Sequence, residues 1–130
     1  MSDPKQAKIL IEAAGRDISA LMGMLDKSIF ADEIFGLHTQ QAAEKLLKAW
    51  LALIGEVYPL THNLELLLDI LRERGIDTQK FASLVEYTPY AGRIRYGIGE
   101  PGDTQLDRVA ALERIEILRE QVLRQEGKTR

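Results

Sequence analysis

Apolar residues recur at spacings of three and four along most of this chain, which is the period of an α-helix. The first helix is predicted to begin at Asp3, a favourable N-cap, with Pro4 in the first helical position. Its core positions have a heptad-like spacing: Ala7, Ile11, Ala14, Ile18, Leu21 and Leu25. Gly15 and Gly23 inside this helix are predicted to be positions that another segment approaches closely.

The second helix is predicted to begin near residues 31–32 and to end before Pro59, because the residue before a proline avoids the α region. One side of it carries a core-facing stripe: Phe35, Ala42, Leu46, Trp50, Leu53 and Val57. Leu47 and Leu51 lie well round from this stripe, so the helix is apolar on more than one side. Such a helix needs a second surface to cover, and we therefore expect a homodimer.

The third helix is predicted to be capped by Thr61 or Asn63 and to end at Gly75. Its inner stripe is Leu64, Leu67, Leu68 and Leu71. Leu66 and Ile70 widen this stripe, so the helix should be buried on most sides.

Two more helices complete the pattern. The shorter one starts at Thr78, and Pro89 and Gly92 disturb or end it. The last is predicted to begin at residues 103–104 and to stop at Gly127. Its core stripe is Ala111, Ile115, Leu118 and Val122. Its arginines alternate with glutamates and are predicted to form a solvated surface: Arg108, Arg114, Arg119 and Arg124.

The predicted fold class is therefore all-α, an up-and-down antiparallel bundle of four main helices plus a shorter one. Residues 1–126 are expected to form a single domain, and residues 127–130 a frayed tail.

Composition narrows the function classes. The net charge of −3 gives no global attraction to nucleic acid, so a nucleotide site would have to be a local basic patch. The chain has no cysteine, which excludes disulfides and thiolate metal sites. The N-terminus lacks the apolar core of a signal peptide, and no apolar run is long enough to span a membrane. We therefore expect a cytoplasmic protein with no membrane partner.

A polar stripe on the second helix is the most informative feature of the sequence. His38, Gln41, Lys45 and Lys48 are spaced so that they share one side of the helix. The pattern H-x-x-Q-x-x-x-K-x-x-K is followed by Y-P-x-T-H-x-L-x-x-L-L, which includes His62. Together these patterns resemble the HEPN family (higher eukaryote and prokaryote nucleotide-binding domains).

A second segment extends this resemblance. The stretch EYTPYAGRIRY, residues 86–96, is similar to the aromatic-rich segment that leads to an Arg-Tyr pair before the last helix of the family. The resemblance implies an all-helical fold, a common tendency to dimerise, and frequent encoding beside a small nucleotidyltransferase. Some family members are RNases, and that activity accompanies an Arg-x(4–6)-His motif.

The candidate ligand-binding residues come from these two segments. Spacing alone favours a solvated flank for the stripe, with Glu44 and Lys48 as an i,i+4 pair, while the resemblance favours a binding face. Arg93 and Arg95, beside Tyr96, are the best phosphate candidates. The alternative is that Arg95 pairs with an internal carboxylate, such as Glu44 or Glu86, while Tyr96 fills the core.

His38 and His62 are the only histidines, and their spacing matches no zinc motif, so no metal or other cofactor is expected. The structural alternatives are a partly buried interface residue for His38 and a capping or interhelix hydrogen bond for His62. Neither histidine follows an arginine at the RNase spacing, so no catalytic residue is assigned. We expect a noncatalytic module that binds a nucleotide, an RNA or a partner protein. The resemblance implies that it is associated with a minimal nucleotidyltransferase, in a toxin–antitoxin or stress context. An RNase toxin with a degenerate site and a purely structural dimerisation module are the alternatives.

Overall fold

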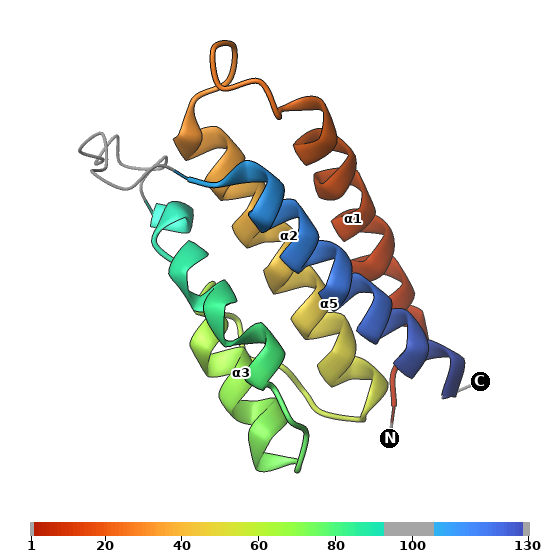
Figure 1. Ribbon diagram of the computed structural model, residues 1–130. Coiled ribbons are helices and arrows are strands. Elements are labelled where there is room, and N and C mark those ends of the chain that lie inside the picture. The colour runs from red at the N-terminus through yellow and green to blue at the C-terminus, as the bar shows by residue number, and fades with distance from the viewer. Residues whose placement is uncertain (1, 93–105, 129–130) are drawn as a thin grey trace.

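The computed structural model describes residues 2–92 and 106–128, and this part of the chain contains helices and no strand. The elements are α1 (Pro4–Gly23), α2 (Asp32–Leu53), α3 (Leu64–Glu73), the 3-10 helix η1 (Gln79–Tyr87) and α5 (Arg108–Lys128). Figure 1 shows α1, α2 and α5 side by side as long helices, with α3 and η1 forming a shorter pair along α2. The predicted all-α bundle of four main helices plus a shorter one is confirmed.

Helix α2 is the centre of the bundle, because α1, α3, η1 and α5 all pack against it. Leu47 and Leu51 are fully buried by the chain's own helices. The surface that they were expected to offer a second copy is thus covered within one molecule, and the argument for a homodimer from these residues is wrong. Val57 was also placed wrongly in the core stripe, since α2 ends at Leu53 and Val57 is 92% exposed.

The start of α1 and both ends of α3 are set by the capping residues that the sequence predicted. The Asp3 carboxylate accepts from the backbone N–H of Gln6, and Asn63 caps α3 by accepting from Glu65 and Leu66. Gly75, with φ of +81°, follows the end of α3 in the left-handed region. The inner stripe of α3 is buried as predicted, whereas Leu66 is 40% exposed, so α3 is buried on one face only.

Close approach occurs at a glycine that the pattern did not single out. No atom of another segment lies within 4 Å of a Cβ built on Gly15 or Gly23, so both predictions of close approach are wrong. At Gly36 on α2, a Cβ would lie 2.3 Å from Cδ1 of Tyr90. The aromatic ring that follows η1 therefore packs directly on the α2 backbone.

Helix α5 has the predicted core stripe, but it ends later than predicted and one of its arginines is buried. Leu106 and Asp107 are not helical, so α5 begins at Arg108, and it continues through Gly127. The predicted start at residues 103–104 lies outside the described residues. Arg108, predicted to be solvated, is 3% exposed.

The buried Arg108 guanidinium holds the connection between α1 and α2. It donates to the carbonyl oxygens of Met24 (2.5 Å) and Phe30 (2.5 Å) and to the carboxylate of Asp32 (2.9 Å). The same group lies over the Phe35 ring, 5.1 Å from its centroid. A planar group with five donors suits this set of diverging acceptors, which a lysine could not satisfy.

Candidate functional site

Two buried carboxylates organise the polar stripe of α2. The first is Asp17 on α1, whose side chain is 10% exposed. One of its oxygens lies 3.0 Å from Nδ1 of His38, and the other accepts from Nζ of Lys45 at 2.6 Å. Because Asp17 comes from α1, the pair of stripe residues joins the two helices.

The second carboxylate is Glu44 on α2 itself, with an 8% exposed side chain. Its Oε1 accepts from Nε2 of Gln40 at 2.9 Å and lies 2.8 Å from Nδ1 of His62. Its Oε2 accepts from Nζ of Lys48 at 2.9 Å. Gln40 also donates to the carbonyl oxygen of His62 at 3.1 Å, so both ends of the histidine are attached to α2.

The hydrogen bonds keep Glu44 ionised. Burial is the largest influence on its pKa and raises it, but the bonds from Lys48, Gln40 and His62 together lower the pKa below the ordinary value of 4.5. Lys48 also lies over the Tyr58 ring, 5.6 Å from its centroid, and the Tyr58 hydroxyl accepts from Gln6. The turn between α2 and α3 is thereby fixed to both α1 and α2.

These contacts show where the predicted polar residues of α2 and His62 lie. His38 and Lys45 meet at Asp17, Lys48 and His62 meet at Glu44, and Gln41 donates to Gln40 at 2.7 Å. The geometry therefore supports the structural alternatives for the two histidines. His38 is a partly buried residue at a helix interface, and His62 makes a hydrogen bond to another helix.

Sequence reasoning missed the roles of Asp17 and Gln40. The i,i+4 spacing revealed the Glu44–Lys48 pair, although that pair is buried and not on a solvated flank. No local signal connects Asp17 to residues on another helix. Its place among the core positions of α1, between Ala14 and Leu21, was the available hint.

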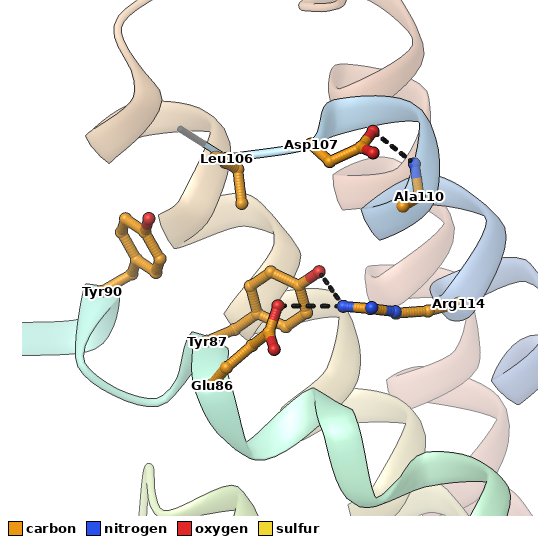
Figure 2. Close-up of a pocket in the computed structure, with 7 residues that line it drawn as sticks. All are labelled: Glu86, Tyr87, Tyr90, Leu106, Asp107, Ala110 and Arg114. Atoms are coloured by element: carbon orange, nitrogen blue, oxygen red, sulfur yellow. Dashed lines mark hydrogen bonds and ion pairs between the residues drawn. The ribbon is translucent and has the colours of Figure 1, made fainter. Parts of the chain in front are cut away.

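A cavity of about 360 Å³ between η1 and α5 is the second candidate site (Figure 2). It is lined by Glu86, Tyr87, Tyr90, Leu106, Asp107, Ala110 and Arg114. Nη1 of Arg114 donates to the Glu86 carboxylate at 2.9 Å and to the Tyr87 hydroxyl at 3.0 Å. The only cation lining the cavity among the described residues is thus already engaged by two acceptors.

The same contacts shift two pKa values. Burial raises the pKa of the Tyr87 phenol, which stays protonated at neutral pH. Burial lowers the pKa of Arg114, but its bonds to Tyr87 and Glu86 outweigh this and raise it overall. Perturbed groups around a cavity are a common property of functional sites and also of structural ion pairs. The predicted phosphate-binding residues lie outside the described part of the chain: Arg93, Arg95 and Tyr96.

Comparison with known proteins decides the family. The family model of the HEPN domain matches residues 7–125, which is most of the 130-residue sequence. The chain belongs to the HEPN domain family. Searches of curated proteins and of solved structures gave no significant match.

In this HEPN domain each of the two histidines lies against a carboxylate, His38 against Asp17 and His62 against Glu44. No three His, Asp or Glu side chains are grouped for a metal ion within residues 2–92 and 106–128. In the same part of the chain, no helix is long and apolar enough to cross a membrane. The stripe and the turn that follows it offer two oriented imidazoles, His38 and His62, each with Nδ1 directed at a carboxylate.

Proposed function

We propose that this protein is a noncatalytic HEPN module that acts by binding a partner protein, with a small nucleotidyltransferase as the first candidate. The observation that carries the proposal is the pairing within the polar stripe. Each lysine and histidine of the stripe, and His62 in the turn after it, faces an internal carboxylate, Asp17 or Glu44. The two lysines balance the two carboxylates, so the stripe is not a basic patch for phosphates.

A partner protein is supported by the turn between α2 and α3. Val57 is 92% and Leu60 is 99% exposed, the highest values among the large apolar residues of the described chain. The turn is nevertheless held in place by Tyr58, by His62 and by the ion pair of Glu56 with Arg74. Apolar side chains on a fixed turn suit protein binding, because little conformational entropy is lost on association.

The proposal predicts that a nucleotidyltransferase is encoded beside the gene of this protein, and calorimetric titration of the purified protein with that enzyme tests it. We expect binding that is weakened by replacing Leu60 with Ser, while the matched exposed residue Ile117 on α5 tolerates the same change. The same preparation should leave labelled RNA intact. Absence of binding at micromolar concentrations of both proteins would contradict the assignment of the nucleotidyltransferase as the partner.

The rival function is an RNase with a degenerate site, favoured by the two carboxylate-held imidazoles. Cleavage needs a group that takes the 2′-hydroxyl proton and another that protonates the leaving oxygen. RNA cleavage that disappears in both His38→Ala and His62→Ala would establish the RNase and overturn the noncatalytic assignment. Binding of nucleotide or RNA by Arg93, Arg95 and Tyr96 is the remaining proposal, tested by RNA affinity with and without Arg95→Ala.

A further inference from the structure

His62 combines a fixed ring with an accessible nitrogen. Its Nδ1 lies 2.8 Å from Oε1 of Glu44, and its side chain is 58% exposed. A carboxylate only accepts hydrogen bonds, so Nδ1 carries the proton that is shared with Glu44. Nε2 lies on the opposite side of the ring and holds the lone pair.

The buried partner makes this nitrogen a better nucleophile than that of a free imidazole. Glu44 is 8% exposed and receives bonds from Gln40 and Lys48, which fix its orientation. A carboxylate behind an imidazole orients the ring and stabilises the positive charge that forms when the other nitrogen reacts.

The surroundings favour an anionic group on Nε2. Nζ of Lys48 is bound to the second oxygen of the same carboxylate, 2.9 Å away, so the negative charge behind the ring is balanced and does not repel an anionic group on Nε2. His62 also precedes Asn63, the N-cap of α3, and the N-terminus of a helix favours negative charge. The chain has no cysteine, so no thiol competes for electrophiles.

We propose that Nε2 of His62 is a phosphoryl-accepting site that reacts with donors containing an activated phosphorus–nitrogen or acyl–phosphate bond. With phosphoramidate as donor, the Nε2–P bond forms while the P–N bond of the donor breaks. The donor nitrogen leaves with its own protons as ammonia. The ring retains its Nδ1 proton, and its new positive charge faces the Glu44 carboxylate. This site does not depend on the proposed partner.

His38 provides the internal comparison. Its Nδ1 lies 3.0 Å from Asp17, whose other oxygen also binds a lysine, Lys45, but the His38 side chain is 35% exposed and that of His62 is 58% exposed. We therefore expect His62 to react before His38. With only two histidines, each adduct can be assigned to one residue.

The test treats the purified full chain with potassium phosphoramidate and follows intact mass and peptide mass at neutral pH. We expect one phosphoryl group on His62, added about tenfold faster in the folded protein than in urea-unfolded protein, which is the lower end of the range seen when the carboxylate behind a metal-binding imidazole is lost. Nα-acetylhistidine with and without urea corrects for any effect of urea on the reagent. His62→Gln should lose this adduct, and His38→Gln should keep it.

Equal rates for folded and unfolded protein, or faster reaction at His38, would overturn the proposal. Glu44→Gln removes the charge while retaining an acceptor, and a folded variant that reacts as fast as wild type would also overturn it. If Glu44→Gln does not fold, the comparison of folded with unfolded wild type and the His62→Gln variant decide the matter by themselves.

Discussion

Arg108 and the lysines of the α2 stripe are basic groups in two different settings. The Arg108 side chain is 2% exposed and serves three carbonyl oxygens and one carboxylate, none of which is close to it in sequence. Lys45 and Lys48 are 27% and 11% exposed and each serves one carboxylate. The comparison teaches that the number of partners and their burial, and not the presence of a positive charge, decide how much a basic residue contributes to stability.

Replacing Arg108 with Ala should have the largest effect on stability. It leaves the carbonyl oxygens of Met24 and Phe30 without a donor and removes the partner of Asp32. We expect the free energy of unfolding to fall by about 3–5 kcal/mol in urea denaturation, because two carbonyl oxygens lose a charged donor, at about 1.5–3 kcal/mol each. Arg119→Ala on the same helix is the control, because Arg119 is 38% exposed and should change stability by less than about 0.5 kcal/mol. Similar losses for both variants would show that the connection between α1 and α2 does not depend on Arg108.

The Glu44 cluster should show its contribution in the pH dependence of stability. The folded-state pKa of Glu44 is lowered, so its contribution is complete above the unfolded value of 4.5 and is lost as the pH falls through the folded-state pKa. Urea denaturation of Glu44→Gln at a series of acidic pH values should give a shallower loss of stability than wild type. Parallel curves for the two proteins would contradict the role of Glu44 as an ionised hub.

Gly36→Ala tests a contact that involves no charge. The added Cβ would meet the Tyr90 ring at 2.3 Å, so the ring must move away from α2. We expect a loss of about 1–3 kcal/mol in thermal or urea denaturation. Gly15→Ala is the matched control, because space is open there, and it should be neutral or stabilising, since alanine favours a helix by about 1 kcal/mol over glycine. A neutral Gly36→Ala would show that Tyr90 is not tightly packed.

The smallest expected effect separates the two lysines. Lys45→Ala should cost less than about 1 kcal/mol, as for a partly exposed pair whose carboxylate keeps a second partner, His38. Lys48→Ala should cost about 1–3 kcal/mol, because it removes a bond to a buried carboxylate. The expected cost is larger than that of a lysine on a solvated flank, where spacing had placed Lys48, because its side chain is 11% exposed. Equal melting temperatures for the two variants would show that the Asp17 and Glu44 clusters do not differ in their contribution to stability. From the sequence we also predict that Arg95→Ala costs more than Lys48→Ala in stability or in ligand binding. This stays a prediction, because Arg95 lies outside the described residues.

The sequence by itself determined the helices and most of their ends, because caps, prolines and the period of apolar residues act locally. Asp3, Asn63 and Gly75 fulfil their predicted roles, and the core stripes of α3 and α5 are buried as their spacing indicated. The polar stripe was also readable from residue spacing, and the resemblance of the stripe and the following turn to the HEPN family is confirmed by the family match.

The tertiary structure alone decided which polar residues meet. Asp17 reaches His38 and Lys45 from another helix, and Arg108 reaches acceptors more than seventy residues away in sequence. Burial reversed the expectation for Arg108 and for Leu47 and Leu51, since periodicity shows that a face is polar or apolar but not which helix covers it. Partners and burial depend on packing between distant segments, and no spacing along one helix contains that information.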